Sequence, residues 1–457
     1  MDEQFLLTTP LAQRLFHDCA KALPIIDYHN HLAIRDLLEG RQFQNLAQLW
    51  IVSDPYKHRA MRICGVDENR ISGDVSDYEK YRAWMETLPK LLGNALYDWS
   101  ILEMKRIFDI DLVPGVTDPD WLWQETNRML SMPGFRATEI LERFGVEYAA
   151  PCAGASEDVS AYAALSRLAP SLRGDDLVPP TLDTIRKLEA LTGISISDLS
   201  AFCQAVIQRL DDFGQVGCRF ADHALDDGFA YFADDGGNEA RFSAILRGET
   251  LPEADRKALS SQVLCFLAGE YAVRGWTMQL HIGAQRFTSS RLRKLVGPAG
   301  GFAGIGNSVD VQSLTGMLDA FEQNENGMPR IILFTLNPAD NAVMSILSGS
   351  YVRDGRPGNV QQGPAWWWCD HLQGMREVFD AISAYGVLWV FIGMTTDSRS
   401  ILSFVRHEYF RRAFCGWIGE KVARGELPEQ EASLRALVEN VCYYNAKRIL
   451  EEGGVTK

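Results

Sequence analysis

Apolar and polar positions follow two different rhythms at the start of the chain. Residues 9–23 (TPLAQRLFHDCAKAL) carry apolar side chains at helical spacing, and Thr9 stands directly before Pro10. Threonine before proline is typical of a helix start, so this stretch is predicted to be a helix. Residues 24–32 (PIIDYHNHL) follow as an apolar run and predict a strand that ends in two histidines.

The rest of the chain divides into a helical part and an alternating part. Residues 40–145 have helical patterns with many Trp and Tyr and no clear strand signal, which predicts a helical insertion. Beyond it, short apolar runs alternate with helical stretches, and this alternation predicts a parallel sheet. The expected strands are residues 146–152, 216–224, 277–284, 330–337 and 387–397. Two Gly- and Asn-rich stretches, 296–308 and 348–363, are predicted to be functional loops.

Length and composition exclude several classes of protein. The 457 residues suffice for one α/β barrel with insertions or for two to three smaller domains. A net charge of −15 argues against nucleic-acid binding, because phosphate contacts need clustered Lys and Arg. The 9 Cys contain no CxxC pair, which favours reduced thiols over a disulfide framework. With no signal peptide and no apolar stretch of membrane-spanning length, we expect a cytoplasmic protein that handles small molecules and has no membrane contact.

Polar residues stand where the expected strands end. His29 and His31 are two apart, so in a strand they point to the same side. His281 lies near the end of one later strand and Asp397 ends the last one. Active-site groups of parallel barrels gather at the carboxyl ends of strands. Two imidazoles and a carboxylate there predict a Zn²⁺ site with one position left for water or substrate.

Each of these residues also has an interpretation without chemistry. The histidine pair could lie on the surface or be hydrogen-bonded in the core, and His281 could be a structural histidine. His223 has acidic neighbours in ADHALD and is expected to support the site rather than bind metal. His407 in RHEYFRR is interpreted as a residue on a helix face. The run AWWWC (365–369) could be core, although three consecutive Trp cannot all face one core.

Longer motifs carry a resemblance to a known family. The start of the chain through DYHNHL resembles the uronate isomerases, also called glucuronate isomerases, of the amidohydrolase superfamily. The likeness runs nearly end to end, and TDSRS followed by RHEYFRR is its most specific part. The other matching stretches are DPYKHRAMRICGV, LHIGAQR, LNPADNAV and VCYYNAKR.

The resemblance implies a single metal-dependent (β/α)₈ TIM barrel over residues 1–457, with 40–145 as an insertion. It implies interconversion of D-glucuronate with D-fructuronate and of D-galacturonate with D-tagaturonate. Carried over by position, the residues expected to hold the metal are His29, His31, Asp397 and His281. Those expected to act on or contact the acid sugar are Asp397, Tyr56, Arg399, Trp366, Trp367 and His58. A homo-oligomer is expected as well.

These residue types suit the chemistry. Aldose–ketose isomerisation moves a proton between C2 and C1 through an enediolate, which needs a base, an acid and positive charge near the oxyanion. Asp397 is expected to take a proton and Tyr56 to shuttle one. Arg399 is expected to hold an oxyanion or the uronate carboxylate through a two-pronged contact.

Two departures from the family pattern favour a changed substrate. The family loop reads Asp-His-Tyr-Lys-Trp-Arg, whereas this chain has Pro55 in place of the histidine and gains His58. The family's Pro-Ser-Trp-Arg-Pro-Asp stretch is matched to VPPTLD (178–183), which places Leu182 at the arginine. We therefore expect low activity on the two ordinary uronates. The alternatives are an enzyme of the same superfamily with a shifted substrate or reaction, such as a hydrolase, epimerase or lyase, and a non-catalytic protein that keeps the fold.

Overall fold

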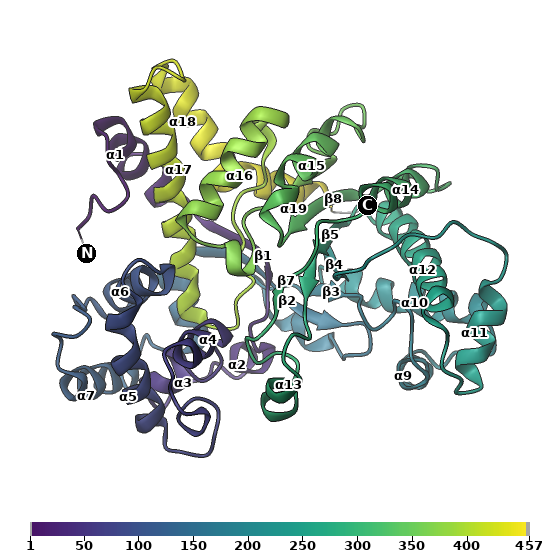
Figure 1. Ribbon diagram of the computed structural model, residues 1–457, viewed down its shortest axis with the longest axis horizontal. Helices are drawn as coiled ribbons and strands as arrows, with labels where there is room; N and C mark the ends of the chain where they lie inside the picture. The colour runs from purple at the N-terminus through teal and green to yellow at the C-terminus, as the bar shows by residue number, and fades with distance from the viewer. Residues whose placement is uncertain (1, 454–457) are drawn as a thin grey trace.

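The computed structural model describes residues 2–453 and places a curled parallel sheet at the centre of the molecule (Figure 1). Seven strands are hydrogen-bonded in the order β1-β2-β3-β4-β5-β8-β9. Their bounds are β1 Ile25–Asn30, β2 Val146–Gly154, β3 Ser171–Arg173, β4 Phe220–Leu225, β5 Thr277–Ile282, β8 Arg330–Thr335 and β9 Val360–Gln362. Every residue of β1, β5 and β8 is buried, as expected of parallel strands covered on both faces.

The eighth position of the barrel is filled without a regular strand. Residues 387–397 were expected to be a strand, and this prediction is wrong in its details, because the segment begins with the 3₁₀ turn Leu388–Val390 and continues as extended, irregular backbone. It still lies beside β1, since the Asp397 N–H donates to the His29 carbonyl at 3.0 Å and the His31 N–H donates to the Ser398 carbonyl at 2.9 Å. The fold is therefore the expected α/β barrel, with seven regular strands and one irregular closing segment.

A glycine explains part of the irregularity. Gly393 has φ +80°, and a Cβ there would lie 2.0 Å from the Val441 carbonyl oxygen. Its own carbonyl accepts from the Tyr28 hydroxyl at 2.8 Å, and Asn445 donates to the Phe391 carbonyl at 2.9 Å. Side chains therefore replace the ladder hydrogen bonds that a strand would have made.

Helices cover the sheet and follow most strands. The group α3 to α7 lies to one side of the barrel, between β1 and β2 in the chain (Figure 1). The helices up to β2 are α1 Pro10–His17, α2 Ile34–Leu38, α3 Leu46–Trp50, α4 Pro55–Ile63, α5 Asp77–Thr87, α6 Ala95–Phe108, α7 Pro119–Leu130 and α8 Ala137–Arg143. Those between β3 and β5 are α9 Leu182–Thr192, α10 Leu199–Gln215, α11 Asn238–Leu246 and α12 Glu253–Val273. The remaining ones are α13 Ser290–Val296, α14 Val311–Glu322, α15 Asn341–Ile346, α16 Leu372–Tyr385, α17 Val405–Ala423, α18 Glu431–Glu439 and α19 Asn445–Glu452.

Local signals fixed the element starts better than their ends. Thr9 caps α1 as expected, because its hydroxyl accepts from the Ala12 N–H at 3.1 Å. The helix ends at His17 rather than at residue 23, and a separate 3₁₀ turn, Ala20–Ala22, leads into β1. The loops at 296–308 and 348–363 contain short pairings that the pattern did not show, namely β7 (Gly304–Ile305), which pairs with β6 (Ala284–Gln285), and β9.

No helix among residues 2–453 is long and apolar enough to cross a membrane.

Candidate active site

The first strand delivers two imidazoles to one carboxylate. His29 Nε2 lies 3.2 Å from Asp397 Oδ1, and His31 Nε2 lies 3.0 Å from the same oxygen. The side chain of His29 is 2% exposed and that of Asp397 6% exposed. The expectation that His29, His31 and Asp397 lie close together therefore agrees with the geometry.

Neighbouring buried polar groups hold the backbone around His29 and Asp397 in place. Asp27 is fully buried and accepts from the Thr396 N–H and from His407 Nε2, both at 2.9 Å. The Thr395 hydroxyl donates to the His29 carbonyl at 2.8 Å. His407 is therefore more than a residue on a helix face, because its hydrogen bond to Asp27 connects α17 with β1 next to the site.

The electrostatics of the cluster are strongly coupled. Burial alone would raise the pKa of Asp397, but hydrogen bonds from His29 and His31 hold that pKa well below its usual range. Burial alone would lower the pKa of His31, but Cys152 and Asp397 raise it to about 9. Burial and the neighbouring His29 lower the pKa of His281 well below its usual value. The site therefore pairs an anionic carboxylate with the His31 imidazole, which a cation would have to deprotonate, and with a neutral His281.

Asp397 and Trp367 share an unusual backbone conformation. Their φ angles are +47° and +48°, in the left-handed region that few residues other than glycine adopt. The adjacent Trp366 donates its indole N–H to Asp397 Oδ2 at 2.7 Å, and its ring lies 4.8 Å from that of His281. Backbone strain of this kind is concentrated at functional sites, where the surroundings enforce it.

Residues that could hold a metal form two groups around His29. One consists of His29, His31 and Cys152, and the other of His29, Asp222 and His281, with the ligand atoms of each group within 4.8 Å of one another. Cys152 and Asp222 were missed by the sequence analysis. Asp222 directly precedes His223 in the predicted strand 216–224. The same rule that drew attention to polar residues at strand ends would have identified it.

A large cavity of about 1110 Å³ opens in front of these groups. The sequence-predicted residues among those that line it are His31, Tyr56, Trp367, Asp397 and Arg399. Arg399 is exposed at this surface. The lining includes Pro55 and does not include His58 or Trp366.

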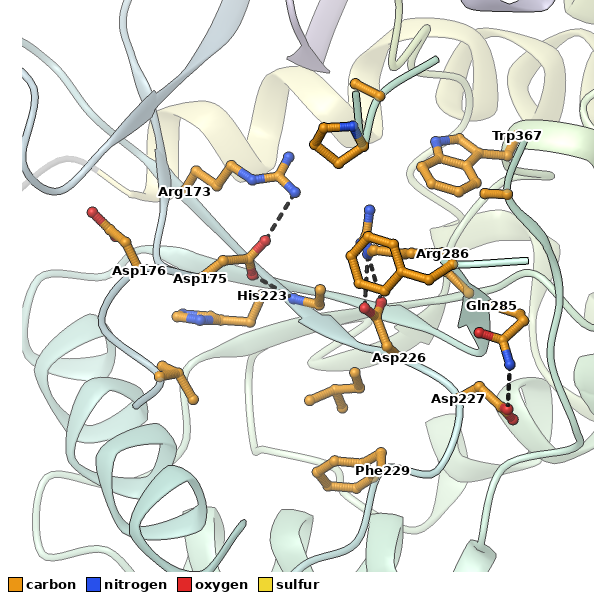
Figure 2. A pocket seen from close by; sticks show the side chains of 18 of the residues that line it. Arg173, Asp175, Asp176, His223, Asp226, Asp227, Phe229, Gln285, Arg286 and Trp367 are labelled. Atoms are coloured by element: carbon orange, nitrogen blue, oxygen red, sulfur yellow. Dashed lines mark hydrogen bonds and ion pairs between the residues drawn. The ribbon is translucent and has the colours of Figure 1, made fainter. Parts of the chain in front are cut away.

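Another wall of the cavity carries two arginine–carboxylate pairs (Figure 2). Arg173, at the end of β3, lies 2.8 Å from Asp175. Arg286 donates through Nε to both carboxylate oxygens of Asp226 at 2.8 Å, and its guanidinium lies 5.3 Å from the centre of the Trp367 ring. The wall therefore presents two guanidinium groups to the same space as the histidines.

Tyr56 and His58 stand on the same helix, α4, with different surroundings. Tyr56 faces Trp368, with ring centres 5.3 Å apart, and its buried hydroxyl has no hydrogen-bond partner among the described residues. Burial raises the pKa of Tyr56 well above its usual value, so this hydroxyl stays protonated. Burial lowers the pKa of His58, whose Nε2 is also unpartnered within the described part of the chain.

Comparison with known proteins agrees with this architecture. The family model described as glucuronate isomerase matches residues 1–450. The chain belongs to the glucuronate isomerase family. It is therefore an enzyme of the intramolecular oxidoreductase class, and the non-catalytic interpretation is not favoured. A uronate isomerase from Salmonella paratyphi B is 39% identical over 462 residues, which cover 98% of each chain.

Solved structures give the same result for the fold of this glucuronate isomerase family member. The crystal structure of uronate isomerase from Thermotoga maritima superposes with a TM-score of 0.91 at 28% identity, covering 98% of this chain and 99% of that one. The structure of glucuronate isomerase from Caulobacter crescentus superposes with a TM-score of 0.89 at 20% identity, covering 99% and 97%.

One sequence argument about this family member needs correction. Leu182 was matched to the family's substrate arginine, but it is the first residue of α9 and does not line the cavity. The segment Pro170-Ser171-Leu172-Arg173-Gly174-Asp175 agrees better with Pro-Ser-Trp-Arg-Pro-Asp, and it ends β3 at the cavity. Arg173 therefore matches the family arginine that seemed to be lost, and the case for a shifted substrate retains only Pro55.

Proposed function

We propose that this enzyme interconverts D-glucuronate with D-fructuronate and D-galacturonate with D-tagaturonate. The observation that carries the proposal is the pairing of two unlike walls around one cavity. The histidine–carboxylate cluster suits the C1–C2 end of an open-chain uronate, where a proton moves. The guanidinium groups in the cavity lining suit the carboxylate of the sugar.

His29, His31 and Asp397 are proposed to hold one divalent ion, with Zn²⁺ as the expected metal. Their donor types fit, since an imidazole nitrogen of His29 and one of His31 lie 3.2 and 3.0 Å from the same carboxylate oxygen of Asp397. When bound there, the ion would supply positive charge for the oxygens of the enediolate. His281 remains a proposed ligand, because its buried Nε2 has no hydrogen-bond partner among residues 2–453.

Proton movement is assigned to Asp397 and Tyr56. Asp397 lines the cavity, and Trp366 holds its second oxygen, so the carboxylate is kept in one orientation. Tyr56 lines the cavity and carries a protonated, buried hydroxyl with no partner among the described residues, and a small movement of the side chain would let a substrate oxygen accept from it. In this proposal Asp397 accepts the proton and Tyr56 donates one to the forming hydroxyl.

The sugar is proposed to lie between Trp367 and the arginines. Arg173 and Arg399 line the cavity from different strand ends, so one can take the carboxylate while the other faces a hydroxyl or oxyanion. His58 is retained as a proposed substrate contact that would require α4 to shift. The enzyme is further proposed to be a cytoplasmic homo-oligomer.

Proton NMR on D-glucuronate and D-galacturonate tests the proposal. In D₂O, we expect ketose signals and loss of the C2 hydrogen signal from the aldose by exchange with solvent. His31→Ala serves as the metal-site control and is expected to abolish both changes. If the parent protein with its metal produced neither ketose nor exchange from either sugar, the proposed reaction would be wrong.

A further inference from the structure

The sulfur of Cys152 faces the imidazole cluster from a different strand. Cys152 belongs to β2, and its Sγ lies 3.5 Å from His29 Nδ1. The thiol donates to Asp222 Oδ1, also at 3.5 Å. Both of these polar contacts are with residues that surround the proposed metal position.

The arrangement of donor atoms is that of a ligand set. One ligand atom each from His29, His31 and Cys152 lies within 4.8 Å of the other two. A divalent ion with bonds of about 2.0 to 2.3 Å to nitrogen and sulfur separates its ligand atoms by comparable distances. Cys152 also lines the cavity, so an ion can reach it without unfolding β2.

A second observation points to a ligand at the same place. His281 Nε2 is buried and has no hydrogen-bond partner among the described residues, although its ring centre lies 4.6 Å from that of His29. A buried polar atom without a partner costs free energy unless something else satisfies it. The cluster therefore contains at least one nitrogen, His281 Nε2, that its hydrogen bonds leave free to bind a ligand.

We propose that Cys152 is a sulfur ligand of the metal, together with His31 and with His29 Nδ1, the imidazole nitrogen that faces the sulfur. In this arrangement His29 Nε2 stays with Asp397 and does not bind the ion. The inference rests on the proposed metal site of this enzyme. As the sulfur–metal bond forms, the S–H bond breaks and its proton leaves to solvent, and no electron is transferred. A thiolate is a soft ligand, so the site would favour Zn²⁺, Co²⁺ and Cd²⁺ over Mn²⁺ and Mg²⁺ more strongly than imidazoles and a carboxylate alone.

Cobalt substitution provides a direct readout that does not depend on turnover. A Co²⁺–thiolate bond gives an intense near-ultraviolet charge-transfer band that imidazole and carboxylate ligands do not give. We expect this band in the Co²⁺-loaded parent protein and its loss in Cys152→Ser. The matched control is Cys203→Ser, which changes a half-buried cysteine on α10 that lines a different cavity, and it should keep the band.

A competition titration measures the size of the effect. Because outer-shell partners alone typically change metal affinity 10- to 100-fold, losing a direct ligand should weaken Zn²⁺ binding by at least about tenfold in Cys152→Ser. Mn²⁺ binding should change less, so the Zn²⁺/Mn²⁺ preference should fall. Circular dichroism melts would show that both serine variants fold like the parent.

The outcomes separate this inference from the function it rests on. Co²⁺ bound in the parent, lost in His31→Ala, but without a charge-transfer band would overturn sulfur ligation and leave the metal site standing. A parent that binds no Co²⁺ would refute the metal site and the sulfur ligand together. A band that survives in Cys152→Ser would show that another cysteine binds the metal.

Discussion

The two walls of the cavity are both charged, yet they are built differently. On the metal-side wall, Asp397 is 6% exposed and His31 21% exposed, and the Asp397 carboxylate contacts His29, His31 and the Trp366 indole. On the arginine wall, Arg173 is 33% exposed and Asp226 38% exposed, and each arginine has a carboxylate partner in the cavity itself. Fixed groups suit chemistry, where misplacement is costly, whereas paired and hydrated groups suit recognition, because a substrate carboxylate can replace an internal partner.

The largest expected effect comes from the fixed wall. Asp397→Asn removes the charge that faces both imidazoles while it keeps the size of the side chain. A positioned acid–base group contributes about 100- to 10,000-fold in rate, so we expect turnover to fall by that range and bound metal to decrease. Steady-state assays with metal analysis would check this. Asp226→Asn on the arginine wall is the control, and an equal loss there would erase the distinction between the walls.

A middle-sized effect is expected on the arginine wall. Arg173→Met should remove a charge-assisted contact worth about 1.5 to 3 kcal/mol, which is roughly a 10- to 150-fold loss in kcat/KM. Because the contact holds the substrate in both ground and transition states, the loss should appear mainly in KM.

Leu182→Arg is the partner experiment to Arg173→Met. Since Leu182 begins α9 outside the cavity, we expect no change in kcat/KM on either uronate. An increase in activity in this variant, with no decrease in Arg173→Met, would restore the original assignment of the substrate arginine to position 182.

A smaller effect on activity is expected at the start of α4, where Pro55 and Tyr56 line the cavity. Pro55→His restores the residue that the family loop has next to Tyr56. We expect turnover on D-glucuronate to change less than about tenfold, because Asp397 and Tyr56 already supply the proton transfers in our proposal. Initial rates for both uronates would measure it. A gain of a hundredfold or more would show that this chain lacks an acid–base group and would revive a shifted substrate.

The smallest expected effect concerns stability rather than activity, at a residue outside both walls of the cavity. Asp98 on α6 is half-buried, and burial raises its pKa to about 6, although the Tyr409 hydroxyl donates to it. A raised carboxyl pKa means that the charged form is disfavoured in the folded state, so the penalty is present above about pH 6 and disappears as the pH falls below the unfolded value.

Asp98→Asn should therefore raise the free energy of unfolding at pH 8, by less than about 1 kcal/mol after allowing for solvent screening. Urea titrations at pH 8 and pH 4 would compare the variant with the parent. Equal stabilisation at both values would mean that a cause other than ionisation is responsible.

The sequence predicted the metal-side wall well because its signals are local. The HxH pair follows an apolar run, and strand periodicity alone places His29 and His31 on one side. Asp397 was found because TDSRS is specific, even though its segment is not the regular strand expected. The irregular backbone depends on Gly393 and on side chains of Tyr28 and Asn445, which no local pattern reveals.

The arginine wall was harder to predict because it depends on register in a very short strand. β3 has only three residues, Ser171–Arg173, which is too short for an alternation signal. Without that strand as a guide, the family stretch was matched to residues 178–183 and its arginine to Leu182. Cys152 was missed for a related reason, because a cysteine inside an apolar strand looks like core until its neighbours in space are known.

The closing segment also sets when the enzyme becomes complete. The hydrogen bond between Thr395 and His29 joins residues that are 366 positions apart in the chain. The regular sheet ends at β1 on one edge and at β9 on the other. A ribosome adding about 5 to 20 residues per second needs on the order of 20 to 70 seconds between these two residues. During that interval the nascent barrel has two unpaired edges and no assembled carboxylate–imidazole cluster. The carboxylate–imidazole cluster therefore cannot form before residue 397 has been synthesised.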